Sequence, residues 1–171
     1  MPVQALELSF RPCDEEAVIA QWEALRGAGL PSQADHSSMA NAPHVTFVAA
    51  NHISPDAVDR ARDLVGPLLP ARLEVRGFVL FGYGSRSTLA LLAEPDRELA
   101  EAVARVRACV PEERHPVWTP HVTLARRVPR SRLATAFEVL NAADGPRELV
   151  CDRVRWWDPY EQVIDDVASV R

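Results

Sequence analysis

The tetrapeptide Pro-His-Val-Thr occurs twice in this chain, at residues 43–46 and again at residues 120–123. An apolar residue follows each copy, and the copies lie 77 positions apart in a chain of 171 residues. Each copy therefore lies near the middle of one half of the sequence. A repeat with this content and placement predicts that one structural unit occurs twice and that both copies contribute to a single site.

In an extended strand, side chains two residues apart lie on the same face. His44 and Thr46 are therefore expected to point together, and so are His121 and Thr123. The apolar residues between and after them take the opposite face, where helices can cover them. One such pair alone is ordinary on a half-exposed sheet, but two identical pairs in matched places favour a functional role.

The remaining pattern predicts an α+β fold in which the order strand, helix, His–Thr strand, helix, strand occurs twice. Residues 1–171 are expected to form one bilobal domain with pseudo-repeat lobes of about 1–84 and 85–171. The expected strands cover residues 5–10, 44–50, 72–81, 87–93, 121–128, 147–157 and 162–167. The expected helices begin at Asp14, Ser54, Pro95 and Ser131 and end near residues 27, 65, 109 and 141.

All 19 basic residues are arginines, and the chain contains no lysine. This composition excludes chemistry through a lysyl-adenylate, a phosphate-loop lysine or a lysine Schiff base. The net charge of −5 argues against a protein that coats duplex nucleic acid nonspecifically.

Four arginines follow the second His–Thr pair, and a guanidinium group binds phosphate through a planar fork of donors. We interpret Arg127, Arg130 and Arg132 as solvated charges near the start of a helix. Arg126 is the candidate for a substrate contact. Strict strand alternation places Arg126 on the apolar face with Val122, unless the strand ends or bulges before it.

The three cysteines are widely spaced and form no CxxC pair, and we interpret Cys13, Cys109 and Cys151 as buried or incidental thiols. A reducing, cytoplasmic location is expected. The first residues lack the apolar run of a signal peptide, and no apolar stretch approaches membrane-spanning length. We therefore expect no membrane partner.

Two imidazoles and two hydroxyls around one pocket suit the in-line cleavage of a phosphodiester. Imidazole titrates near neutral pH, so one ring can act as a base while the other acts as an acid. Threonine hydroxyls can stabilise the charge that builds on the phosphate oxygens. A metal site is less favoured, because each strand supplies one imidazole and no adjacent carboxylate. We expect neither a metal nor another cofactor.

The two H-x-T-hydrophobic motifs resemble those of the two-histidine (2H) phosphoesterase superfamily, which includes the 2′-5′ RNA ligase-like cyclic phosphodiesterases. The second copy, residues 119–126, is similar to the second motif of that superfamily, including its trailing arginine. The first copy departs from it, with Val48-Ala49-Ala50 where bacterial ligase-like members usually have Phe-Leu-Gly. Residues 29–32 and 156–158 are similar to a shorter bacterial branch of the superfamily.

This resemblance implies two antiparallel sheets that face a central cleft. It also implies metal-independent opening of 2′,3′-cyclic phosphates on RNA ends or nucleotides, which usually leaves a 2′-phosphate. Carried over by motif, His44 and His121 are the catalytic acid–base pair. Thr46, Thr123 and Arg126 then bind the substrate phosphate. We expect His121 to be the base and His44 the acid.

Two other functions remain open from the sequence: ATP-independent 2′-5′ joining of RNA ends, and a nucleotide- or RNA-binding module without catalysis. Histidines without a matched partner are interpreted as surface or turn residues: His36, His52 and His115. Three aromatic side chains can stack on a nucleobase, although core packing is the favoured interpretation: Phe81, Tyr83 and Trp118.

Overall fold

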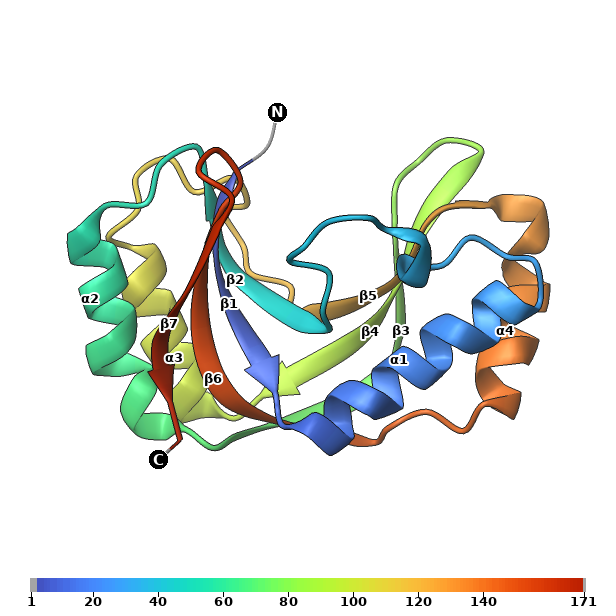
Figure 1. Ribbon diagram of the computed structural model, residues 1–171, viewed down its shortest axis with the longest axis horizontal. Coiled ribbons are helices and arrows are strands. Elements are labelled where there is room, and N and C mark those ends of the chain that lie inside the picture. The colour runs from blue at the N-terminus through green and yellow to red at the C-terminus, as the bar shows by residue number, and fades with distance from the viewer. Residues whose placement is uncertain (1–2, 171) are drawn as a thin grey trace.

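The computed structural model describes residues 3–170, which form an α+β fold with four helices and seven strands (Figure 1). The predicted order of elements is confirmed. The first half contains β1 (Gln4–Phe10), α1 (Pro12–Gly27), β2 (His44–Ala50), α2 (Pro55–Leu64) and β3 (Ala71–Phe81). The second half contains β4 (Arg86–Pro95), α3 (Arg97–Arg107), β5 (His121–Pro129), α4 (Leu133–Ala142), β6 (Glu148–Asp158) and β7 (Val163–Ser169). Three short 3-10 helices complete the described chain: η1 (Gln33–Asp35), η2 (Gly66–Leu68) and η3 (Arg130–Arg132).

The strands are paired antiparallel in the order β2-β1-β6-β3-β4-β5, and β7 also pairs with β6. The two sheets that we expected to face each other are joined, because residues 71–74 of β3 pair with residues 148–151 of β6. Both β3 and β6 have 11 residues. One end of each strand joins the two sheets, while the rest of β3 pairs with β4 and the rest of β6 pairs with β1. The result is one continuous sheet that bends around a cleft.

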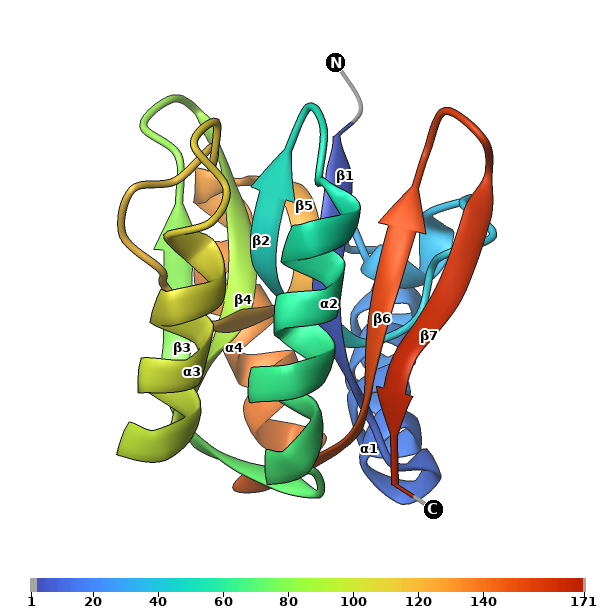
Figure 2. The same ribbon diagram turned by 90° about the vertical axis from the view of Figure 1, so that its left-hand side faces the viewer.

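Each lobe of the molecule combines elements from both halves of the sequence. The first lobe holds β1, β2, β6 and β7 with α2 and α3 packed together outside them (Figure 2). The second lobe holds β3, β4 and β5 with α1 and α4 (Figure 1). The repeated units therefore exchange a helix and a strand each, since α1 and β3 lie in the second lobe and α3 and β6 lie in the first. This exchange fixes the position of one lobe against the other.

The apolar face of each His–Thr strand is buried under helices, as strand alternation predicts. Val45 and Phe47 of β2 are 0% exposed, and α3 packs against this strand. Val122 and Leu124 of β5 are also 0% exposed and lie under α1. The opposite face of both strands is therefore left for the cleft. No helix within residues 3–170 has both the length and the apolar character needed to cross a membrane.

Two of the four helices, α2 and α3, have a side-chain N-cap, whereas α1 and α4 have none. Pro95, where α3 was expected to begin, is the last residue of β4, and Ser131, where α4 was expected to begin, lies in η3. Ser54 caps α2 and Asp96 caps α3, each accepting a hydrogen bond from the backbone of the first turn. Asp14 was the expected cap of α1, but the helix begins at Pro12, whose fixed φ suits the first helical position. Asp14 lies instead in the first turn, where its carboxylate accepts a hydrogen bond from the backbone N–H of Val150.

A one-residue bulge follows the His–Thr pair of β2. Thr46 pairs with Glu7 of β1, and the next residue of β1, Leu6, pairs with Val48, so Phe47 is the extra residue. The bulge buries two consecutive apolar side chains and returns the strand to the cleft side one residue late.

The same bulge occurs in β5 and changes the position of Arg126. Thr123 pairs with Ala90 of β4, and Leu89 pairs with Ala125, so Leu124 is the extra residue. Leu124 and Ala125 are both buried, and Arg126 is exposed at the cleft. Strict alternation was therefore wrong for Arg126, because the bulge restores it to the face that carries the His–Thr pair.

Leu124 at this bulge is a sensitive position for stability. Leu124→Ala is expected to lower the free energy of unfolding by about 2–5 kcal/mol, because the side chain is fully buried and its removal leaves a cavity. Leu80→Ala is the control on β3, since Leu80 is 42% exposed and its truncation should cost less than about 1 kcal/mol. Urea denaturation of both variants measures the difference, and equal losses would contradict this description of the bulge.

Candidate active site

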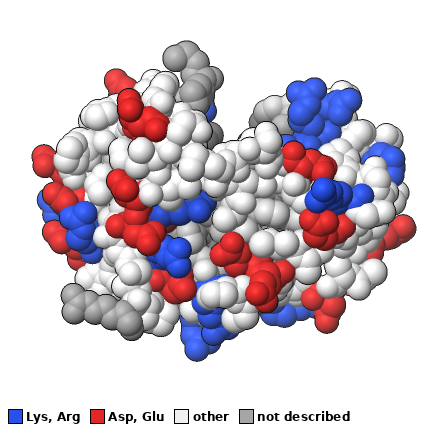
Figure 3. Space-filling view, in the orientation of Figure 1, with Lys and Arg blue, Asp and Glu red and all other residues white. Residues whose placement is uncertain are grey.

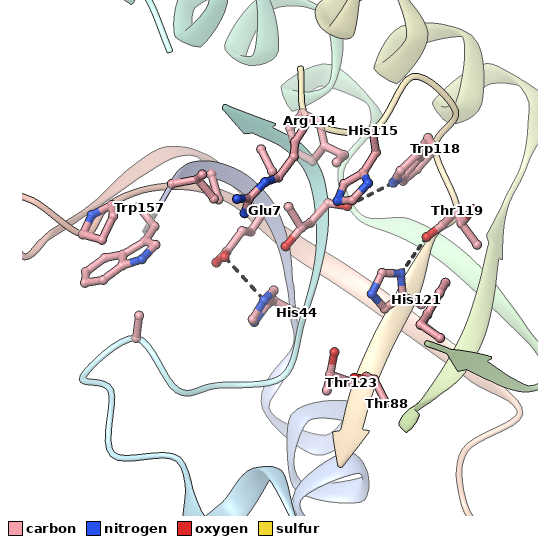
Figure 4. Close-up of a pocket in the computed structure, with 18 of the residues that line it drawn as sticks. Glu7, His44, Thr88, Arg114, His115, Trp118, Thr119, His121, Thr123 and Trp157 are labelled. Carbon is pink, nitrogen blue, oxygen red and sulfur yellow. Dashed lines mark hydrogen bonds and ion pairs between the residues drawn. The ribbon is translucent and has the colours of Figure 1, made fainter. Parts of the chain in front are cut away.

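A cavity of about 960 Å³ opens between the lobes and is lined by all five residues predicted for the site. These residues come from the two bulged strands: His44 and Thr46 from β2, and His121, Thr123 and Arg126 from β5. Figure 4 shows the two imidazoles on opposite sides of the cavity, with Thr123 below the space between them. The two copies of the sequence motif therefore meet at one site.

Both imidazoles are anchored in the same way by the backbone. Nδ1 of His44 lies 2.7 Å from the carbonyl oxygen of Ala42, and Nδ1 of His121 lies 2.7 Å from that of Thr119. A carbonyl oxygen can only accept, so Nδ1 carries the proton in each ring and Nε2 is left for the cavity. The proline between the two partners fixes the backbone turn that brings this carbonyl to the ring. The proline of the repeated tetrapeptide therefore orients the catalytic candidate that follows it.

Tryptophan side chains hold the backbone at both bulges. The indole N–H of Trp118 donates to the carbonyl oxygen of Thr46 at 3.0 Å. The indole N–H of Trp22, on α1, donates to the carbonyl oxygen of Thr123, also at 3.0 Å. Each bulge is thus fixed at the residue whose hydroxyl is a candidate phosphate ligand.

The surroundings of the two rings differ, and the difference begins with Glu7 of β1. Oε1 of Glu7 lies 3.4 Å from Nε2 of His44 (Figure 4), a separation at which a protonated imidazole forms an ion pair. The other oxygen of Glu7 accepts a 2.6 Å hydrogen bond from Nε of Arg155. Glu7 and Arg155 are only 4% and 7% exposed, so this ion pair holds the carboxylate firmly in place.

Arg155 also approaches the ring of His44 itself. Its Nη2 lies 3.4 Å from Nδ1 of His44 and 3.2 Å from the carbonyl oxygen of Ala40. The contact of the same Nδ1 with the carbonyl oxygen of Ala42 is much shorter, at 2.7 Å. Nδ1–H therefore donates its hydrogen bond to Ala42. Arg155 therefore acts on His44 through its charge and through the position of Glu7.

Among residues 3–170, no carboxylate lies within ion-pair distance of His121. Burial lowers the pKa of His121 below its ordinary value, the hydrogen bond to Thr119 opposes this shift, and the nearby charges of His44, His115 and Arg126 lower the pKa further. Phe81 packs against the ring with centroids 4.6 Å apart. The neutral form of His121 is thus favoured near pH 7, with an unprotonated Nε2.

Sequence patterns did not identify Glu7 or Arg155 as site residues. In β1 the alternation of Leu6, Glu7 and Leu8 is that of a strand with one face toward solvent, yet every residue of β1 is buried. The second face of β1 lies against the cavity instead, since β1 is an inner strand with neighbours on both sides. The sequence did offer one signal for Glu7, namely a charged residue within a strand that pairs with a His–Thr strand.

The other histidines and aromatic residues considered in the sequence differ in their distance from the cavity. His36 and His115 are exposed and line the cavity, whereas His52 is exposed elsewhere. Phe81 lines the cavity beside His121, and Trp118 lines it while bonding to the backbone of β2. Tyr83 was expected in the core, but it is fully exposed because it lies at the tip of the turn between β3 and β4.

The cysteines are also placed by the structure. Cys13 and Cys109 are exposed, and Cys151 is buried in β6, where burial raises the pKa of its thiol. Within residues 3–170, no three His, Cys, Asp or Glu side chains gather as a metal ion requires.

The sequence profile of the 2′-5′ RNA ligase superfamily matches residues 14–162, and the chain belongs to this superfamily. The predicted resemblance is thereby confirmed. The superfamily includes phosphodiesterases and RNA ligases, and membership supports a phosphoesterase-type activity. A comparison with curated protein sequences gives no match.

Solved structures share the fold over nearly the whole chain. Usb1 of Kluyveromyces marxianus with uridine monophosphate is 12% identical, covers 97% of this chain and 98% of its own, and has a TM-score of 0.57. E. coli LigT complexed with 3′-AMP is 14% identical, with 99% of this chain and 95% of its own covered and a TM-score of 0.55. At these identities the similarity concerns the fold alone, and it confirms the α+β class.

The electrostatic setting of His121 is open to a direct test by NMR. Its imidazole is expected to titrate below 6.5, and Arg126→Gln should raise the pKa because it removes one of the positive charges that disfavour protonation. Arg132→Gln is the control, since Arg132 does not contribute to this shift. Titration of the ring ¹⁵N signals measures both effects. An ordinary or raised pKa in the wild-type protein would show that the charge distribution described here is wrong.

Proposed function

We propose that this protein is a metal-independent phosphodiesterase that opens 2′,3′-cyclic phosphates of RNA ends or nucleotides and leaves 2′-phosphates. The observation that carries this proposal is the contrast between two equally anchored imidazoles. Both direct Nε2 toward one cavity, but only His44 lies beside a carboxylate, while His121 has a lowered pKa. One ring is thus suited to give a proton and the other to accept one at the same pH.

The reaction follows from this division of roles. Nε2 of His121 takes a proton from a water molecule as its oxygen attacks phosphorus. Nε2 of His44 gives a proton to the 3′ oxygen, and the bond between phosphorus and that oxygen breaks. The bond from phosphorus to the 2′ oxygen remains, so the product carries a 2′-phosphate and a free 3′ hydroxyl.

The remaining site residues stabilise the phosphate. The hydroxyl groups of Thr46 and Thr123 donate hydrogen bonds to the nonbridging oxygens, where negative charge builds in the transition state. Arg126 lies on the same face of β5 beyond Thr123 and supplies a positive charge to the same group. The pseudo-symmetric position in β2 holds Ala49, so β2 itself supplies no such charge, although Arg114, whose backbone N–H donates to the carbonyl oxygen of Ala49, also lines the cavity.

Glu7 is a positioning residue in this account. Its carboxylate stabilises the protonated form of His44 before the reaction, and Arg155 fixes the carboxylate at the ring. After the reaction His44 is neutral and His121 carries the proton taken from water. Release of that proton to solvent and uptake of one by His44 restore both rings for the next turnover.

A panel of 2′,3′-cyclic nucleotides and cyclic-ended oligoribonucleotides tests the proposed function. Hydrolysis to 2′-phosphates is expected in the presence of EDTA and without any nucleoside triphosphate, with products resolved by anion-exchange chromatography. RNA with a free 5′ hydroxyl is included as an acceptor. Joined products in place of hydrolysis would favour 2′-5′ end joining, and binding without conversion would favour a binding module. Activity that depends on a divalent ion would contradict the proposed mechanism.

The role of Glu7 predicts a specific change in the pH dependence. Glu7→Gln removes the negative charge beside His44 and leaves the guanidinium of Arg155 only 3.4 Å from the ring. The protonated acid becomes less stable, so the high-pH limb of kcat should move to lower pH and turnover above neutrality should fall roughly ten- to hundredfold.

Glu148→Gln is the matched control, because Glu148 pairs with Arg72 on the exposed surface. This control should retain the wild-type pH profile. A Glu7→Gln enzyme that slows equally at all pH values, with its limbs unmoved, would show that Glu7 has only a structural role.

A further inference from the structure

We propose that an arginine rim beside the cavity binds the single-stranded RNA that precedes the reacting end. We define this rim as Arg86, Arg127, Arg130 and Arg132 together with Tyr83. The inference deepens the proposed function, on which it rests, by assigning oligoribonucleotide ends rather than mononucleotides as the substrate class.

The rim is formed by two neighbouring segments that contain no acidic residue. The sequence has no Asp or Glu between Glu74 and Glu94, and none between Glu113 and Glu138. Pairing of β4 with β5 places Arg86 opposite Pro129, so the tip of the β3–β4 hairpin lies beside η3. Positive charge therefore accumulates over this part of the surface, although the whole chain has a net charge of −5.

The arginines of the rim are exposed and free of ion pairs. None of the four contacts a carboxylate of residues 3–170, whereas Arg62, Arg72 and Arg76 on other surfaces each have an acidic partner. Like charges this close together repel each other, and an anionic partner relieves the repulsion. A cluster of unpaired positive charges is typical of a surface that binds an anion, whereas ordinary protein surfaces mix both signs of charge.

Backbone contacts hold the cluster in place. Nη1 of Arg86 donates to the carbonyl oxygen of Arg127, and Nη2 of Arg130 donates to that of Gly82. Arg127 has a φ of 59°, a left-handed conformation that is strained for a residue other than glycine. In the pairing of β4 with β5, two residues of β5, Arg126 and Arg127, lie opposite the single residue Thr88 of β4. Both arginines are exposed at this irregularity.

The rim continues the wall of the cavity. Thr88 and Arg126 line the cavity, and both lie next to Arg127 of the rim, Thr88 across the β4–β5 ladder and Arg126 along β5. Figure 3 shows blue atoms at the top of the second lobe, along one edge of the hollow between the lobes. A strand whose terminal phosphate lies between the two imidazoles can therefore pass directly over the rim.

Tyr83 distinguishes single-stranded RNA from other polyanions. Its ring is fully exposed at the hairpin tip, and a large aromatic ring in water is suited to stack on an unpaired base. Bases within a duplex are already stacked and cannot use it. An acidic peptide would satisfy the arginines but would leave the ring without a matched partner.

Equilibrium binding tests this inference independently of catalysis. The probe is a fluorescent octaribonucleotide that ends in a 2′-phosphate, compared with the corresponding mononucleotide by anisotropy and competition over a range of salt concentrations. The wild-type protein should bind the octamer more tightly. Arg127→Asn/Arg132→Gln should lose most of this advantage and reduce the slope of log affinity against log salt by roughly 1.4. Asparagine is chosen at position 127 because it tolerates a positive φ.

Two further variants complete the experiment. Tyr83→Ala should weaken octamer binding at least about fivefold through the loss of stacking. Arg60→Gln/Arg105→Gln is the matched control, since it removes two exposed arginines without ion pairs from α2 and α3 and should retain the octamer advantage.

Several results would overturn the inference. One is equal affinity of the wild-type protein for octamer and mononucleotide, and another is an equal loss in the two double variants. Equally tight binding of a duplex or of polyglutamate would identify the rim as a general polyanion surface. Because the probe is not turned over, a protein that binds it as predicted but cleaves no cyclic phosphate would refute the proposed function and leave the rim assigned.

Discussion

The fold and the site both depend on the one-residue bulge that follows each His–Thr pair. Regular pleating would have to place polar and apolar residues in strict alternation along β2 and β5. The bulges at Phe47 and Leu124 instead bury two consecutive apolar side chains and return the strand to the cleft afterwards. They also expose the threonine carbonyls that the indoles of Trp22 and Trp118 fix. Core packing and cleft geometry are thereby set at the same two points.

The repeated frame carries an asymmetric distribution of charge. His44 and His121 have the same backbone anchor, yet one lies beside a buried ion pair and the other against an aromatic ring with its pKa lowered by burial. Different surroundings favour opposite protonation states in two otherwise identical histidines, which lets one act as acid and the other as base at the same pH. Glu7 comes from an inner strand that both halves of the chain have to assemble, because β1 lies between β2 and β6. The exchange of strands between lobes is thus connected with the proposed chemistry.

The sequence predicted the element order, the buried faces of both His–Thr strands and five of the residues that line the cavity. Those features follow from local periodicity and from a motif short enough to lie within one strand. Arg126 was a candidate substrate contact, but strand alternation alone placed it on the opposite face, since the bulge arises from the pairing of β5 with β4. Sequence patterns missed Glu7 and Arg155, whose roles come from the neighbours of β1 and β6 in the sheet. The exposure of Tyr83 depends on the length of the hairpin, which periodicity does not fix.

The central claim is that His44 and His121 act as one unit on a single phosphodiester, and a double-mutant cycle tests it most directly. Turnover of a 2′,3′-cyclic phosphate is measured for the wild type, His44→Ala, His121→Ala and the double variant. Each single change is expected to reduce kcat by roughly 10²–10⁴, and the double change by little more, because losing either ring disables the pair. Full activity in a single variant, or losses that multiply in the double variant, would contradict the claim.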